Sequence, residues 1–259
     1  MELNNPPVSQ TWIGFAFEKP LQGRPWDLRA ASEFLSRFDS SLPHREAIFA
    51  TQYEIQNLSS ARLPKIVNRE DQLQQVKAHN PEGTHWLQLV EDRLVFNRTR
   101  GSEGYLGFES LLEESLGKLS EYVEYFRPSA LRSAELHYVD QIEIPMPTGD
   151  TINLQDYFRL RVEIPDEYGP AWHFSTRLFL HPPVEGDILE VRFQSEGQKP
   201  GANAFRFRID WHMVCSEVGT FDQEVVKGRL TQAHESLAKY FRASVTERTW
   251  ALFEPSEEG

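Results

Sequence analysis

Four arginines and two histidines are the side chains of this sequence that are best placed to bind a ligand. Several of them lie in runs where polar and apolar residues alternate, as between Phe205 and His212. Alternation with a period of two is typical of a β-strand with one buried and one exposed face. The candidate ligand-binding residues are Arg177, Arg192, Arg206, Arg208, His137 and His212. If helices cover the apolar face, these side chains gather on the other face, where they suit an anionic group or an acidic peptide.

The same pattern has a plainer interpretation. Exposed faces of antiparallel sheets are usually polar, and charges on neighbouring strands often pair with one another. Glu190 and Asp210 fall on the same expected sheet face as these arginines, where they could form ion pairs with them across neighbouring strands. The sequence alone leaves both interpretations open.

Motifs of known catalytic chemistry are missing from the sequence. It has no Gly-rich phosphate loop, no Gly-x-Ser-x-Gly and no His-Glu-x-x-His. His234 and Glu235 are neighbours on an expected helix, where consecutive side chains point about 100° apart. We therefore assign no catalytic residue, no metal ligand and no cofactor. The enzyme hypothesis that stays open is a small hydrolase with a site assembled on the sheet from His137, Asp140, His173 or His212.

The overall composition is that of a folded, acidic protein. The chain has 259 residues, of which 12% are aromatic, and its formal net charge is −12. Negative charge opposes binding to nucleic acids and to membrane surfaces, so we expect neither. The single cysteine, Cys215, excludes an internal disulfide. With neither a signal peptide nor a membrane-spanning run in the sequence, we expect a cytoplasmic protein.

The elements that must position the candidate residues indicate an α+β fold. Strands are expected over residues 11–18, 46–56, 134–145, 172–180, 188–194 and 204–215, with a hairpin over 85–97. Short helices are expected after Asp27 and over 154–160, and long ones over 108–126 and from a capping box at Thr220. A last short helix should start at Thr246. Residues 57–83 are weakly patterned and are expected to form a loop.

These elements occur in a similar order in two parts of the chain. We expect a largely antiparallel sheet with the two long helices on one face. Residues 1–130 and 131–259 would form two α+β halves, closely packed or sharing one core. Each half reads as strand, short helix, strands and long helix, so the halves either form a pseudo-two-fold repeat or match by coincidence.

The strand over 134–145 divides the two halves. Leu136, Tyr138, Ile142 and Ile144 should form its packing side, with His137 and Gln141 on the other side. Asp140 falls on the packing side. We therefore expect it either to hydrogen-bond a buried partner or to lie at a bulge.

Three short motifs resemble a sporadically distributed family of bacterial proteins of unknown function. They are the arm Asn5-Pro6-Pro7-Val8, the strand from Leu136 to Ile142 with the Leu154–Phe158 segment after it, and the His234–Phe241 helix followed by Thr246. The family has Arg, Asn and Arg where this chain has His137, Asp140 and Gln141. The resemblance implies the fold more than an activity, and the scattered occurrence of the family associates it with mobile or defence genes.

The function that we expect is non-catalytic binding through the polar, arginine-containing sheet face. The expected partner is another protein, as for an antitoxin, an immunity protein or a component of a defence system, and a homo-oligomer stays open. The alternative is the small hydrolytic enzyme described above.

Overall fold

The computed structural model describes most of the chain. The described residues are 6–19, 22–56, 65–101, 107–146, 152–160, 174–182, 184–198, 201, 203–219 and 221–253, with backbone alone for 51–56 and 65–71. The strands are β1 (Val8–Phe17), β2 (His44–Gln56), β3 (Lys65–His79), β4 (His85–Val90), β5 (Arg93–Thr99), β6 (Leu131–Pro145), β7 (Ser175–Leu180), β8 (Ile188–Gln198) and β9 (Ala204–Ser216). The helices are α1 (Leu28–Leu35), α2 (Phe108–Phe126), α3 (Gln223–Ser244) and α4 (Glu247–Trp250), with 3-10 turns at η1 (Ser36–Phe38) and η2 (Leu154–Asp156).

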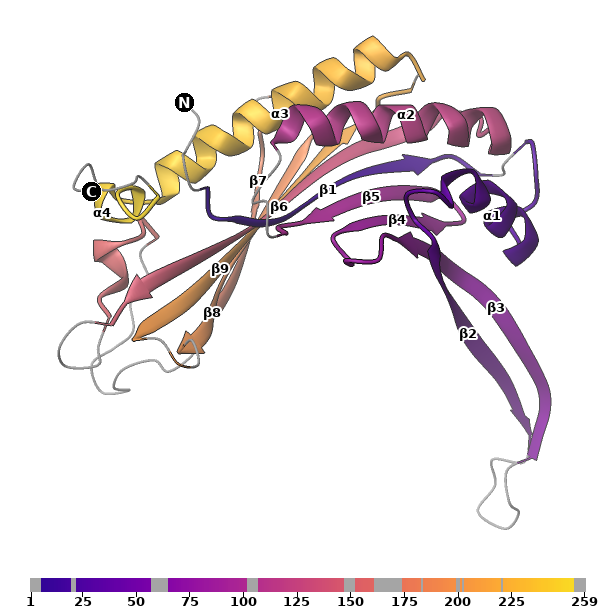
Figure 1. Ribbon diagram of the computed structural model, residues 1–259, viewed down its shortest axis with the longest axis horizontal. Helices are drawn as coiled ribbons and strands as arrows, with labels where there is room; N and C mark the ends of the chain where they lie inside the picture. Colours follow the sequence, from indigo (N-terminus) through magenta and orange to yellow (C-terminus); the bar gives the residue numbers. More distant parts are fainter. Residues whose placement is uncertain are drawn as a thin grey trace.

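The strands in the described residues form one antiparallel sheet, which confirms the expected α+β class. Its nine strands run in the order β2-β3-β4-β5-β1-β6-β9-β8-β7. The sheet is strongly twisted, and Figure 1 shows it arching beneath the long helices. β1 and β6 pair near its centre. The candidate site residues, which come from the second half of the chain, lie in the part of the sheet formed by β6, β9, β8 and β7.

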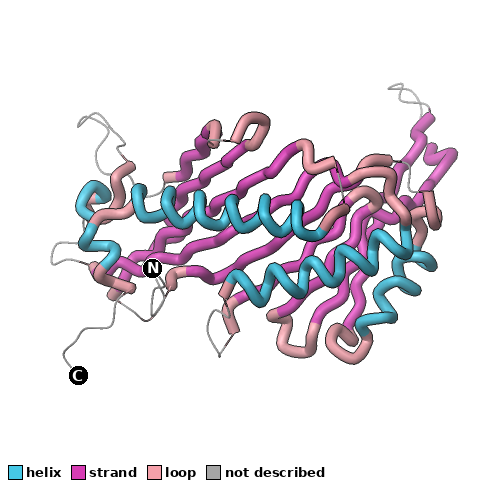
Figure 2. Tube along the Cα trace, turned by 90° about the horizontal axis from the view of Figure 1, so that it is seen from above, coloured by secondary structure: helices cyan, strands magenta, loops and turns pink. Residues whose placement is uncertain are grey.

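Helix α2 packs on β1 and β5, and α3 packs on β6 and β9. The ring of Phe17 in β1 stacks on Tyr122 of α2, with ring centroids 4.5 Å apart. In β6, the Tyr138 hydroxyl and His234 Nδ1 of α3 are joined by a 2.8 Å hydrogen bond. Seen from above, both helices lie over the strands (Figure 2). The buried core runs along this layer through residues of both parts of the chain.

The helix ends follow from their capping residues. Asp27 accepts a hydrogen bond from Ala30 N at the start of α1, and Thr246 accepts one from Thr249 N at the start of α4, as the sequence predicts. For α3 the prediction was wrong in its detail. The helix starts at Gln223 with Asp222 as its N-cap, because the Asp222 carboxylate accepts from the backbone of residues 224 and 225.

Strand β6 has the expected packing side. Leu136, Ile142 and Ile144 are fully buried, and Asp140 is also buried. Trp211 Nε1 of β9 donates a 2.9 Å hydrogen bond to Asp140 Oδ2. The predicted buried partner of Asp140 is therefore confirmed, and the pairing of β6 with β9 is continuous at this point.

Two expected elements differ from the structure. Residues 65–79 of the expected loop form strand β3, while 57–64 lie outside the described residues. Among the β3 residues whose side chains are described, only Val76 and Ala78 are buried, so the strand carries little apolar alternation to be read from sequence. The expected helix over 154–160 is reduced to the single turn η2.

No helix among the described residues is both long enough and apolar enough to cross a membrane.

Candidate ligand-binding face of the sheet

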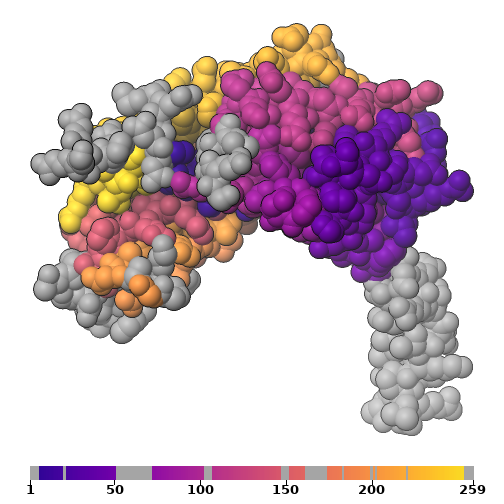
Figure 3. All heavy atoms as spheres, in the orientation of Figure 1, coloured from indigo at the N-terminus to yellow at the C-terminus, as the bar shows by residue number. Residues whose placement is uncertain are grey.

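The candidate residues all lie on strands β6 to β9 and share one face of the sheet. Cross-strand partners point to the same side of a sheet. His137 is paired with His212, Arg192 with Asp210, and Arg177 with Arg192. Arg206 and Arg208 occupy the same alternate positions of β9 as His212. Figure 3 shows that the molecule is hollowed on this side, between the β8-β9 part and the β3-β4 part. We call this surface the concave face.

One row of directly paired residues crosses the concave face from edge to edge. We call it the cross-sheet row. In spatial order it consists of His44, His79, Trp86, Asn97, Trp12, His137, His212, Glu190 and Phe179. Most of these side chains are partly exposed, and seven of the nine are aromatic rings or imidazoles. A row of this composition offers flat surfaces for packing together with polar edges.

Trp12 is at the centre of the row. Its ring stacks on His137 with centroids 4.9 Å apart and lies 5.1 Å from that of His212. Two residues further along β1, Gly14 leaves room for the indole, since a Cβ there would lie 3.0 Å from the ring. The local sequence of β1 therefore sets the position of this tryptophan on the concave face.

A second aromatic group occupies the β2-β4 end of the row. The His44 and His79 rings stack with centroids 4.9 Å apart, and His79 stacks on Trp86 at 4.2 Å. The Lys77 ammonium lies 5.9 Å from the Trp86 ring centroid. Trp86 is fixed by its Nε1–H, which donates to Gly83 O at 2.7 Å.

Glu135 is a buried carboxylate at the edge of the concave face. His212 Nε2 donates to Glu135 Oε2 at 3.1 Å, and Arg93 lies 3.2 Å from Oε1. Burial raises the pKa of Glu135, but the hydrogen bond from His212 and the charge of Arg93 outweigh it and hold the pKa below its usual value. The carboxylate is therefore ionised at neutral pH and fixes the orientation of the His212 ring.

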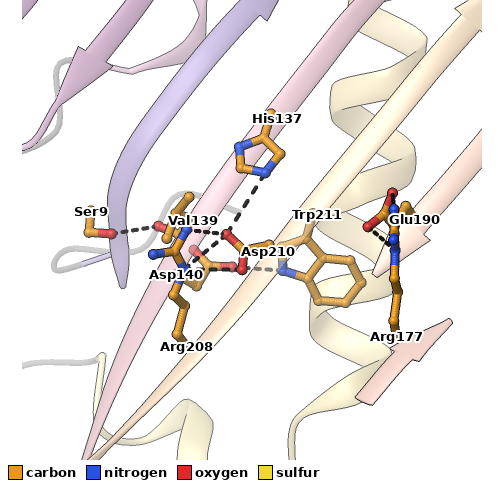
Figure 4. Close-up of polar contacts among 9 residues, drawn as sticks. All are labelled: Ser9, His137, Val139, Asp140, Arg177, Glu190, Arg208, Asp210 and Trp211. Carbon is orange, nitrogen blue, oxygen red and sulfur yellow. Dashed lines mark hydrogen bonds and ion pairs between the residues drawn. The ribbon is translucent and has the colours of Figure 1, made fainter. Parts of the chain in front are cut away.

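His137 is held in its neutral form. Burial, helped by the nearby His212 and Arg208, lowers the pKa of His137 to about 3. Its Nε2 lies 3.8 Å from Asp210 Oδ1 (Figure 4). Because the ring is neutral, this contact is not an ion pair. Asp210 is instead neutralised by Arg208, which donates to it from Nε at 3.0 Å and from Nη2 at 2.6 Å.

The four arginines differ in whether a carboxylate of the same chain already pairs with them. Arg177 is paired with Glu190 at 2.7 Å, Arg208 with Asp210, and Arg206 with Glu143 at 3.4 Å. Arg192 is exposed and has no side-chain hydrogen bond or ion pair within the described part of the chain. Its cross-strand neighbour Asp210 is already occupied by Arg208. Both sequence interpretations thus have a counterpart in the structure, since three arginines pair internally and one remains available.

Sequence reasoning missed the part of the concave face that the first half supplies. Trp12, Trp86, His79 and His44 had no role among the predicted site residues. The signal was present in β1, where Trp12 and Gly14 alternate with the buried Ile13 and Phe15. What the sequence lacked was the pairing of β1 with β6, which brings Trp12 beside His137.

The described residues hold no evident metal site. No group of three or more His, Cys, Asp or Glu side chains among them is arranged to hold a metal ion. Neither a scan against protein-family models nor a search of the curated proteins found a match.

Proposed function

We propose that this protein is a non-catalytic binding protein that holds another protein against its concave face. The observation that carries the proposal is the cross-sheet row, which spans every strand of the sheet in the hollow of the arch (Figure 3). Tryptophan and arginine are among the residue types that most often dominate binding at protein interfaces. Trp12, Trp86 and Arg192 combine these types on one surface.

The charges of the concave face favour a protein partner over a nucleic acid. A nucleic-acid surface needs an excess of cations to replace the counterions of the phosphates. Here Glu143, Glu190 and Asp210 neutralise arginines of the same face. Arg192, which has no side-chain partner among the described residues, instead suits a single carboxylate of a partner protein, which it can bind through two parallel hydrogen bonds.

The arrangement of the hydrogen bonds supports a preformed surface. Trp86 is held by Gly83, His212 by Glu135, and Arg208 by Asp210. Side chains that are already ordered lose little conformational entropy when a partner binds. A rigid, concave surface of this kind fits a convex folded partner.

The experiment compares partner capture by matched variants. Arg192→Glu reverses the unpaired charge and Trp86→Ala removes an anchor ring, while Val225→Lys changes an exposed residue of α3 on the opposite side. We expect a partner that co-purifies with the wild type and with Val225→Lys to be lost with Arg192→Glu and weakened with Trp86→Ala. Equal recovery with all three variants would contradict binding through the concave face.

The resemblance to a sporadic bacterial family suggests an antitoxin, immunity or defence role, which we include in the proposal. The physical requirement of such a role is tight binding to one partner. Growth of cells that express a candidate toxin, with wild-type protein or with Arg192→Glu, tests it. Protection by the wild type alone supports the role, and protection by neither removes it.

A second candidate is a small hydrolytic enzyme. The observation that favours it is the pair of His212 and Glu135, in which a buried carboxylate orients a partly exposed imidazole as it does beside a general base. Purified protein assayed on a panel of ester and phosphoester substrates tests this candidate. Activity lost in His212→Ala and kept in Arg192→Glu would favour the enzyme over the binding protein.

The order of the strands also supports the proposal that the two halves are a structural repeat with both long helices on one face. In each half a central strand, β1 or β6, is followed by a meander that ends beside it, in β5 or β9, and then by a long helix. β1 and β6 are antiparallel neighbours, as a two-fold axis between them requires. In an experimental structure, superposing one half on the other by a rotation near 180° would bear this out, and a relation without a two-fold axis would contradict it.

A further inference from the structure

Strand β7 forms one edge of the sheet and is poorly covered. Among the described residues, its only strand neighbour is β8. The long helix nearest to it, α3, packs on β6 and β9, further inside the sheet. The outer backbone groups of an edge strand are a template for a further strand, so natural edges are usually protected.

The exposed side chains of β7 are mostly apolar, although exposed edge strands usually carry charged residues that prevent further strand pairing. Leu178 is 37%, Phe179 62% and Leu180 37% exposed, and the adjacent Ile188 of β8 is 45% exposed. Leu178 and Leu180 lie on one face of the strand and Phe179 on the other, since side chains alternate. The single charge within the strand, Arg177, is paired with Glu190 of the same chain.

The opposite edge of the sheet is protected in the ways that β7 is not. Strand β2 also exposes apolar residues, Ile48 and Phe49. However, its pairing with β3 has register shifts at Ile48/Phe49 and at Glu54/Ile55, whereas β7 pairs with β8 without a shift. Bulges twist an edge and discourage further pairing. β7 is therefore the edge that is suited to accept another strand.

We propose that β7 pairs antiparallel with β7 of a second copy of this chain, about a two-fold axis through Phe179. A second copy is favoured because Leu178-Phe179-Leu180 reads the same in both directions, so two antiparallel copies of this strand place like residues opposite one another. In this register Phe179 faces Phe179 of the other copy, and Leu178 faces its Leu180, so apolar residues meet on both faces of the new sheet. Isologous pairing of this kind closes a dimer and leaves only the two β2 edges, whose register shifts discourage further pairing.

The dimer would extend the binding surface as well as cover the edge. Phe179 is the terminal residue of the cross-sheet row. Pairing through Phe179 therefore makes the rows of the two copies continuous across the two-fold axis. The dimer contact lies at the β7 edge and its test needs no partner protein, so the dimer and the proposed function can fail independently.

The test combines sedimentation with site-directed crosslinking of the full chain. Phe179→Lys places a charge in the apolar contact and should weaken dimerisation at least about tenfold, while the matched change Phe49→Lys on the other edge should leave it unchanged. Both residues are exposed, so neither change disturbs the core. A monomeric wild type, or a dimer lost only in Phe49→Lys, would overturn the proposal.

Crosslinking tests the register itself. Residues directly opposite in an antiparallel pair have Cβ atoms about 4.5–5.5 Å apart, within reach of a slightly adjusted disulfide. Phe179→Cys should therefore form a covalent dimer on mild oxidation, whereas Arg177→Cys, two residues from the axis, should not. The native Cys215 is buried and stays in both variants. Crosslinking that is stronger at 177 than at 179 would contradict a two-fold axis through Phe179.

Discussion

The buried carboxyl group of Asp140 makes the stability of this protein depend on pH in a way that can be calculated. Burial, which outweighs the stabilising hydrogen bond from Trp211, raises the pKa of Asp140 from 3.8 to about 7, and the negative Asp210 adds to the effect. The folded state therefore binds this proton more tightly than the unfolded state does. Stability from this group is full at low pH and falls as the pH rises from about 4 to about 7.

The variant Asp140→Asn isolates this effect because the amide cannot ionise and its oxygen can still accept from Trp211. Between about pH 5 and about pH 8, the two pKa values correspond to a loss of about 2 to 3 kcal/mol in the wild type alone. Urea unfolding of both proteins at these two pH values measures it. Between these two pH values we expect the unfolding free energy of the wild type to fall by this amount more than that of Asp140→Asn. The variant therefore becomes more stable relative to the wild type at the higher pH.

The quantity to compare is the difference in unfolding free energy between the wild type and Asp140→Asn, because the other titrating groups contribute equally to both proteins. If the stability difference between wild type and variant is the same at both pH values, Asp140 does not titrate in this range and the account of its burial is wrong. If the wild type gains stability over the variant as the pH rises, Asp140 is stabilised as an anion, which also contradicts it.

Two substitutions and one labelling experiment test other parts of the structure. Glu135→Gln should act in the opposite sense from Asp140→Asn, because the pKa of Glu135 is lowered: burial raises it, but His212 and Arg93 lower it more. In urea unfolding this variant should be less stable than the wild type near neutral pH, and the difference in unfolding free energy should shrink as the pH falls below about 4. A difference that grows at low pH would contradict the pairing of Glu135 with His212 and Arg93. Tyr122→Phe should raise the unfolding free energy by about 1 kcal/mol, because the buried hydroxyl has no hydrogen-bond partner among the described residues, and a clear loss of stability would reveal a missed partner. Burial raises the pKa of Cys215 to about 12, so a thiol reagent at mildly alkaline pH should label the native protein far more slowly than the urea-unfolded protein, and equal rates would place the thiol at the surface.

Local patterns predicted the elements that pack on the core. Helix α2 has the predicted bounds because its apolar residues recur every three or four positions and Pro128 follows it. The packing side of β6 and the buried partner of Asp140 follow from period-two alternation in the same way. These signals are strong because one side of each element is buried.

Elements that bury little could not be predicted in the same way. The sequence of β3 predicts a loop because it carries no clear periodicity, and few of its described side chains face the core. The sequence predicts candidate site residues only in the second half of the chain. Most of them follow from alternation, but the pairing of β1 with β6 that brings Trp12 to His137 depends on contacts far apart in the sequence.

The proposed function requires that the concave face, and not the side of the sheet that carries α3, contacts a partner protein. A photo-crosslinking amino acid tests this most directly when it replaces Gln194, which lies on the concave face beside Arg208, or Val225, which is exposed on α3. In cells of the source organism, we predict that irradiation yields one discrete adduct with another protein from position 194 and none of that mass from position 225. The same adduct from 225 alone, or from both positions equally, would contradict the account.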